Sequence, residues 1–178
     1  KRQLLDRVSV MSTMWIGTFL AALDTTMVAT VMSQVGSEFA VSNTVAWLGT
    51  SYMLTQMACQ PLYGRLSDAF GRRAMTLFAS SVFFVGTLSC GLSRTFVQLC
   101  IARAMAGLGG SGLTSLATMV VSDMTRVQAR ATWQGLGNVI FAIGAALGGP
   151  LGGAVVDAQW GWRWAFLLQV PLCAAHLL

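Results

Sequence analysis

Long apolar runs separated by short polar segments dominate the sequence. Between Val8 and Ser37 the only ionisable residue is Asp24, and Thr95–Ser122 carries only Arg103. Charged residues are absent from four further runs: 39–64, 74–93, 131–156 and 164–178. A membrane-spanning helix needs about 20 predominantly apolar residues. The pattern therefore predicts five complete spans and a sixth that reaches the end of the sequence.

The charge-free runs set the expected boundaries of these helices. We predict helices at approximately 10–32, 43–63, 74–93, 96–121, 132–156 and 164–178, so that residues 1–178 form one membrane-embedded unit. The first run exceeds the apolar core of about 7–15 residues in a cleaved signal peptide, so we expect a retained span. Because the sixth run stops at Leu178 and the sequence starts at Lys1, we expect the natural chain to be longer.

Composition and the distribution of charge support an all-α polytopic membrane protein. Charged residues make up 10% of the chain, against roughly 25% in soluble domains, and 55% of residues are hydrophobic. Most basic residues fall in connections on one side of the predicted bundle: Lys1, Arg2, Arg7, Arg65, Arg72, Arg73, Arg126 and Arg130. The positive-inside rule then predicts a cytoplasmic N-terminus. The net charge of +5 reflects topology, and no basic patch for nucleic acid is expected.

Small residues recur at helix-packing spacing in the fifth predicted span. Gly144, Gly148 and Gly152 repeat every four residues, as do Gly149 and Gly153. Such spacing lets helix backbones approach closely in lipid, and Pro150 between them introduces a kink. Static tight packing and a helix that slides during conformational change both explain this pattern. The four cysteines lack metal-ligand spacing, so no metal site is predicted.

Asp24 and Arg103 are the ionisable residues inside the predicted spans. A charge at the bilayer centre costs roughly 2.5–3.5 kcal/mol and usually marks an ion or substrate path. We therefore hypothesise that Asp24 binds a proton or a cationic substrate. Arg103 would tune the pKa of Asp24 or hold an anionic group. The alternatives are a buried ion pair that only fixes packing, or an Arg103 side chain that extends to the interface.

Uncharged polar residues could complete a cavity beside this pair. The candidates are Thr25, Gln56 and Asn138, with Thr26 next to the first of them. Each could instead hydrogen-bond to a neighbouring helix. The run Gly107–Gly112 fits a dinucleotide-binding GxGxxG pattern, but it lies inside a span and lacks the strand and acid that this fingerprint requires.

The segment Gly64–Arg73 resembles the signature between helices two and three of the major facilitator superfamily, departing at Ala69. We expect Gly64 to end the second helix and Gly71 to allow a tight turn. The resemblance implies that Gly64, Asp68, Gly71 and Arg72 form a cytoplasmic gating loop. A solvated turn with topology-setting arginines is the alternative.

Three further stretches narrow the resemblance. Leu23–Thr26 looks like the helix-one motif of the fourteen-helix drug:proton antiporters, and Arg103 with Gly107 resembles their helix-four motif. The helix-five antiporter motif is matched, with its proline displaced by one residue, at Gly148, Gly149, Pro150, Gly152 and Gly153. Longer stretches are similar to fungal vacuolar basic amino acid transporters: Ala29–Met32, Trp47–Tyr52, Val121–Asn138 and Gly161–Pro171.

The resemblance implies the N-terminal six-helix half of a transporter, built from inverted three-helix repeats. Its implied function is proton-coupled transport of basic amino acids into the vacuole, with a proton gradient in place of any cofactor. The implied partners are the lipid bilayer, a cationic small-molecule substrate and the C-terminal half of the same transporter. A multidrug or toxin proton antiporter of the plasma membrane is one alternative, and a non-transporting membrane sensor is another. No catalytic constellation is present, so an enzyme is not expected.

Overall fold

The computed structural model describes residues 2–41, 43–157 and 161–177. Within these ranges the chain folds into seven helices and no strand. The long helices are α1 (Arg2–Glu38), α2 (Trp47–Phe70), α3 (Arg72–Leu92), α4 (Phe96–Met124) and α5 (Val127–Asp157). Two short helices follow, α6 (Arg163–Leu167) and α7 (Val170–Leu177).

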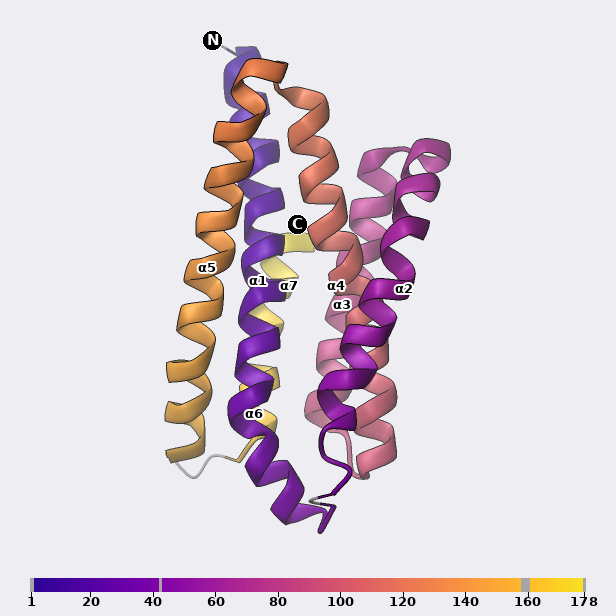
Figure 1. The fold of residues 1–178 in the computed structure, drawn as a ribbon, viewed down its shortest axis with the longest axis vertical. Coiled ribbons are helices and arrows are strands. Elements are labelled where there is room, and N and C mark those ends of the chain that lie inside the picture. Colours follow the sequence, from indigo (N-terminus) through magenta and orange to yellow (C-terminus); the bar gives the residue numbers. More distant parts are fainter. Residues whose placement is uncertain (1, 42, 158–160, 178) are drawn as a thin grey trace.

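The helices form an elongated bundle in which α1 and α4 occupy the middle (Figure 1). The α5 helix runs along α1, and α2 runs along α4, while α3 packs against α4, α6 and α7. In Figure 1 the connections α2–α3 and α4–α5 lie at the upper end, where α1 begins. At the lower end α1, α3 and α5 end, and α2, α4 and α6 begin. All long helices therefore run from one end of the bundle to the other.

Glycines let α4 press against two neighbours at once. A Cβ on Gly107 would meet the carbonyl oxygen of Tyr52 in α2, and one on Gly109 would meet the backbone nitrogen of Phe83 in α3. These close approaches compensate in lipid for a weak hydrophobic drive between helices, because van der Waals contact increases as backbones come together. The result is a tightly packed α2–α4–α3 unit.

The predicted close approach along α5 is present on one of its two glycine rows. A Cβ on Gly144 would lie 2.8 Å from the Phe19 carbonyl oxygen, and one on Gly148 would lie 2.7 Å from the Leu23 carbonyl oxygen. Gly152 continues this row against α1. The second row, Gly149 and Gly153, has no atom within 4 Å of an added Cβ and faces away from α1.

The second helix extends beyond the predicted end, and the prediction that Gly64 terminates it is wrong. The α2 helix continues to Phe70, and Gly64 lies inside it, with an added Cβ 3.3 Å from the methyl carbon of Met119. The helix extends because its last two turns expose Arg65 and Asp68 and need no apolar environment. Gly71, at φ +88°, provides the turn that was predicted.

By length and composition, four helical segments of the described chain could cross a membrane: Val10–Glu38, Arg72–Leu92, Phe96–Met124 and Val127–Val155. The α2 helix, predicted as a span, is long enough but less apolar, since it carries Thr50, Ser51, Thr55, Gln56 and Gln60. A polar helix is tolerated at membrane depth where it faces protein or a water-filled cavity.

The predicted sixth helix is interrupted. Residues 168 and 169 separate α6 from α7, whereas the sequence pattern predicted one helix over 164–178; residue 178 lies outside the described ranges. The cause is Pro171, which has no backbone N–H to donate to the Leu167 carbonyl and whose ring crowds that carbonyl.

Candidate functional site

The two ionisable residues predicted inside the spans meet in the interior of the bundle. Asp24 comes from the middle of α1 and Arg103 from the second turn of α4. Arg103 Nη1 donates to both carboxylate oxygens of Asp24, at 2.9 Å to Oδ1 and 2.8 Å to Oδ2. The side chains are 0% and 1% exposed, so the pair is shielded from any solvent. The alternative that the Arg103 side chain extends to the membrane interface is therefore wrong.

Aromatic rings enclose the guanidinium. The Arg103 Cζ atom lies 4.5 Å from the ring centroid of Tyr52 in α2 and 5.7 Å from that of Phe166 in α6. Tyr52 reaches this position because Gly107 and Gly110 leave room on α4 for its backbone and hydroxyl. Cation–π contact stabilises a buried guanidinium most when water is excluded.

Several polar atoms around the pair lack hydrogen-bond partners within the described structure. They are Arg103 Nε, the Tyr52 hydroxyl and Gln169 Oε1. Gln169 is itself fully buried and donates from Nε2 to Met27 Sδ at 3.2 Å, one turn along α1 from Asp24. Unsatisfied buried polar groups are costly and often mark sites that rearrange. Sequence reasoning missed Gln169, although a lone amide in an apolar run is a recognisable signal.

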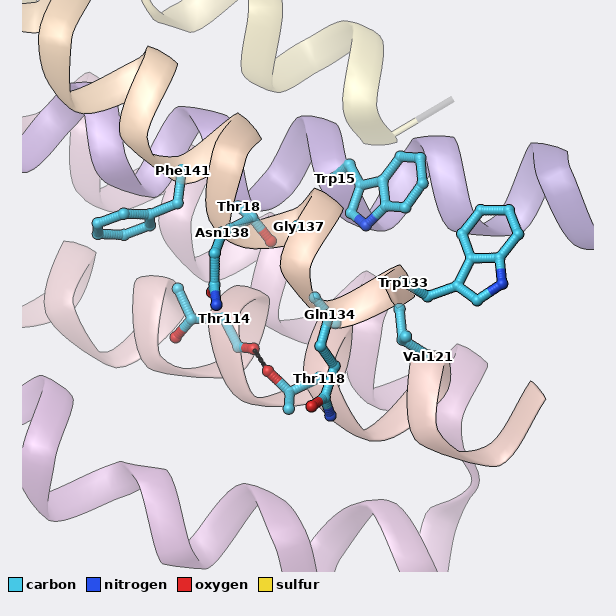
Figure 2. A pocket seen from close by; sticks show the side chains of 11 residues that line it. Trp15, Thr18, Thr114, Thr118, Val121, Trp133, Gln134, Gly137, Asn138 and Phe141 are labelled. Carbon is cyan, nitrogen blue, oxygen red and sulfur yellow. Dashed lines mark hydrogen bonds between the residues drawn. The ribbon is translucent and has the colours of Figure 1, made fainter. Parts of the chain in front are cut away.

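A cavity of about 230 Å³ lies between α1, α4 and α5 (Figure 2). Figure 2 shows Gln134 and Asn138 of α5 pointing toward Thr118 and Thr114 of α4. Asn138 was predicted to help form a cavity beside the Asp24–Arg103 pair; it lines this separate cavity instead. Gln134 was missed, although it precedes Asn138 by four residues and so shares its helix face. Asp24 and Arg103 do not line this cavity.

Two indole rings also line this cavity. Trp15 of α1 and Trp133 of α5 stack with centroids 5.8 Å apart and an interplanar angle of 24°. Trp15 Nε1 is buried and lacks a partner in the described part of the chain. The cavity thus combines aromatic surface, amide groups and hydroxyls.

The other two predicted cavity residues, Thr25 and Gln56, do not line this cavity. Thr25 donates to the Ala22 carbonyl of its own helix at 2.7 Å. Gln56 is half-buried on α2, which packs on the opposite side of α4 from Asn138. The predicted polar set Thr25, Gln56 and Asn138 therefore does not form one cluster in this conformation.

A charged cluster at the upper end of the bundle includes two of the predicted gating residues. Arg72 binds Asp68 at 3.0 Å and Asp123, at the end of α4, at 3.1 Å. It also contacts the Ser67 hydroxyl and lies 3.3 Å from Met119 Sδ. We call these side chains the Arg72 cluster. Asp123 was missed, because nothing in its spacing tells which charge it meets.

The predicted helix-five motif packs directly behind the helix-one motif. A Cβ on Gly148 would collide with the Thr26 hydroxyl, and one on Gly152 would lie 3.2 Å from the Met27 carbonyl oxygen. The α5 helix continues through Pro150 to Asp157. These glycines fix how close α5 lies to the α1 segment that carries Asp24.

Comparison with known proteins identifies the fold and the lineage. Residues 14–178 match the family described as the Major Facilitator Superfamily. The chain belongs to the Major Facilitator Superfamily. Its members are membrane transporters, so the chain is a membrane-spanning transporter segment and not an enzyme.

Relatives within the superfamily are named either as multidrug resistance proteins or as vacuolar amino acid transporters. The chain is 47% identical over 167 residues to multidrug resistance protein fnx1 of Schizosaccharomyces pombe, covering 94% of this chain and 31% of that protein. It is 40% identical over 168 residues to vacuolar basic amino acid transporter 1 of Saccharomyces cerevisiae, covering 94% of this chain and 30% of that protein. The chain thus spans about 30% of the length of these relatives.

Solved structures of the superfamily share the architecture. The inward-open xylose transporter XylE from E. coli aligns with a TM-score of 0.82 at 16% identity, covering 96% of this chain and 46% of that chain. The human organic anion transporter MFSD10 aligns with a TM-score of 0.80 at 21% identity, with the same coverage. At these identities the likeness concerns the fold alone.

Proposed function

We propose that this chain provides the proton-coupling helices of a transporter that moves basic amino acids into the vacuole in exchange for protons. The observation that carries the proposal is the fully buried Asp24–Arg103 pair, which joins the helices α1 and α4 in the middle of the bundle. The names of relatives supply the substrate class, since vacuolar basic amino acid transporters are 40% and 42% identical to the chain.

The chemistry of the pair suits a proton switch. While Asp24 is ionised, its two carboxylate oxygens accept both hydrogen bonds from Arg103 Nη1. A proton on the carboxylate removes the charge that attracts the guanidinium, so the free energy that holds α1 against α4 falls. Because the site is shielded from water, this change is large compared with the same event at a surface. Proton binding at Asp24 then alters helix packing, as coupled transport requires.

The Arg72 cluster supplies the gate in this proposal. The surplus of basic residues at the upper end orients the N-terminus toward the cytoplasm. The Arg72 cluster then lies at the cytoplasmic face, where it ties the α2–α3 turn to the end of α4.

Reconstitution with a pH gradient tests the proposal. In proteoliposomes that contain the full-length transporter, we expect Asp24→Asn to abolish uptake of radiolabelled lysine driven by the gradient. Exchange of lysine for lysine without a gradient should persist, because it needs no net proton movement. Glu38→Gln, which removes a half-exposed carboxylate at the lower end, is the matched control. Gradient-driven uptake that survives in Asp24→Asn overturns the role of Asp24.

Efflux of cationic drugs or toxins is the second candidate function. It is favoured by the 47% identity to multidrug resistance protein fnx1. Parallel uptake assays with lysine and with a cationic dye separate the two: dye transport without lysine transport supports the exporter. A protein that transports neither would fit the sensor hypothesis.

A further inference from the structure

We propose that His176 is a second proton-binding site, held between α1, α3 and α7 and separate from the Asp24–Arg103 pair. The His176 side chain is buried, at 7% exposure, and contacts two other helices. Its Nε2 atom lies 2.9 Å from the Thr13 carbonyl oxygen of α1, and its Nδ1 atom lies 3.1 Å from the Ser80 hydroxyl oxygen of α3. One titratable side chain thus joins α7 to both neighbours.

The partner of Nε2 fixes one proton on the ring. A carbonyl oxygen can only accept a hydrogen bond, so the contact with Thr13 requires an N–H at Nε2. Gly17, one turn further along α1, leaves room for this approach, because an added Cβ there would lie 2.9 Å from Nε2. The ring is therefore either neutral with its proton on Nε2 or a doubly protonated imidazolium.

The partner of Nδ1 can serve both of these states. The Ser80 hydroxyl donates to the Thr76 carbonyl at 2.8 Å, which leaves its oxygen lone pairs to accept from the Nδ1–H of an imidazolium. When Nδ1 carries no proton, the hydroxyl can rotate and donate to Nδ1 instead. The ring can therefore gain or lose the Nδ1 proton while both of its nitrogens stay hydrogen-bonded.

A cavity of about 570 Å³ connects the ring with the charged upper end of the bundle. Its charged lining consists of Arg72 and Arg73 from α3 and Asp123 from α4. Arg72 is paired with carboxylates, and Arg73 is exposed, so water screens its repulsion of an imidazolium. On α7 itself, Cys173 lies one turn before His176. The lining residues from α1 carry no charge: Val10, Thr13 and Met14. Through the exposed Arg73 the cavity reaches solvent, which gives a proton a route to the ring.

Protons at His176 and at Asp24 act on α1 in opposite directions. Thr13 precedes Asp24 by about three turns, or roughly 16 Å along the axis of α1. A proton on Asp24 removes the charge that attracts Arg103, whereas a proton on His176 makes both of its hydrogen bonds charge-assisted and so stronger. In acid, α1 is then held less firmly by α4 and more firmly by α7. This step alone rests on the proposed role of Asp24.

Nitrogen NMR of the full-length transporter in nanodiscs tests the site directly. The protein is isotope-labelled at the histidine ring nitrogens, and His176→Gln identifies the signals of this ring by their loss. We expect both ring nitrogens to carry protons at about pH 5 and only Nε2 at about pH 8. Ser80→Ala should lower the ratio of charged to neutral ring at a fixed pH about fivefold, because a hydrogen bond from a charged donor contributes more than one between neutral groups.

Ser81→Ala is the matched control. Ser81 is the next residue on α3, is exposed and donates to the Leu77 carbonyl at 2.8 Å, so the variant loses the same kind of hydroxyl away from the ring. Its spectra should equal those of the wild type. His176 signals that do not change between the two pH values overturn the site, and so does a neutral ring with its proton on Nδ1. Equal spectra for Ser80→Ala and Ser81→Ala overturn the role of Ser80.

Backbone hydrogen exchange in α7 tests whether the proton strengthens these contacts. After division by the intrinsic exchange rate at each pH, protection of α7 should be severalfold higher at about pH 5 than at about pH 8 in the wild type. In His176→Gln it should be equal at both. A pH response of the same size in the two proteins contradicts the strengthening. Neither measurement needs a transported substrate or a proton gradient, so a failure of the proposed function leaves these outcomes as they are.

Discussion

Two ion-paired regions of this molecule use the same chemical groups in opposite surroundings. Arg103 and Asp24 are 1% and 0% exposed, whereas Arg72, Asp68 and Asp123 are 34%, 70% and 54% exposed. Both regions join an arginine on one helix to a carboxylate on another. What differs is the medium, because water screens the Arg72 cluster and protein surrounds the interior pair.

This difference in exposure decides which of the two ion-paired regions can store free energy. Removing one member of a buried pair leaves an uncompensated charge and costs about 3–5 kcal/mol. Exposed pairs typically contribute about 0–1 kcal/mol, since solvent competes for each partner. The interior pair therefore suits a switch that responds to a single proton, and the Arg72 cluster suits a contact that opens and closes with little cost.

The largest expected effect comes from Arg103→Ala. The substitution strands the Asp24 carboxylate in the interior and removes the cation that covers Tyr52, so stability should fall by about 3–5 kcal/mol. Thermal unfolding of the purified transporter in nanodiscs measures the loss. The double variant Asp24→Leu with Arg103→Met should recover most of it, because no charge then remains buried. A double variant as unstable as the single one would contradict this account.

A smaller effect is expected from Gly71→Ala. Gly71 lies at φ +88° with open space around it, so an added methyl group meets no neighbour, and only backbone strain of about 1–3 kcal/mol arises. Gly135→Ala, also in open space but within a helix, is the control and should be neutral or slightly stabilising. Equal melting temperatures for the two variants would contradict the assignment of backbone strain to position 71.

The smallest effect is expected from Arg72→Gln. Its ion pairs are exposed, so the loss should be within about 1 kcal/mol and should disappear in 1 M salt, where screening acts over about 3 Å. Melting temperatures at low and high salt measure this. Arg103→Ala should show no such salt dependence. A large, salt-independent loss in Arg72→Gln would mean that the Arg72 cluster behaves like the interior pair.

The sequence predicted the helical architecture because charge-free runs report directly on the membrane. It also singled out Asp24 and Arg103, since an ionised group in such a run is conspicuous. A buried pair of the two was one of the alternatives, but the sequence could not select it, because the residues lie 79 positions apart along the chain. Asp123 and Gln134 were missed for the same reason, as each acquires its role from a neighbouring helix.

The predicted helix ends were wrong where the backbone, and not the apolar pattern, decides where a helix stops. Hydropathy placed the end of α2 at about residue 63, but a helix can leave the membrane and continue in water, here to Phe70. The grouping of Thr25 and Gln56 with Asn138 failed because helix rotation about its axis is not visible in a list of polar residues. Thr25 instead bonds its own backbone.

The interruption between α6 and α7 leaves a thinly bonded junction beside the guanidinium. Phe166, which covers Arg103, belongs to the piece before the break, and Gln169 lies at the break itself. Pro171 has no N–H to offer the Leu167 carbonyl, so the bonds from Leu168 N–H to the Trp164 carbonyl and from Gln169 N–H to the Phe166 carbonyl hold the end of α6. The aromatic cover over Arg103 therefore hangs on a helix end with fewer backbone bonds than an unbroken helix would give it.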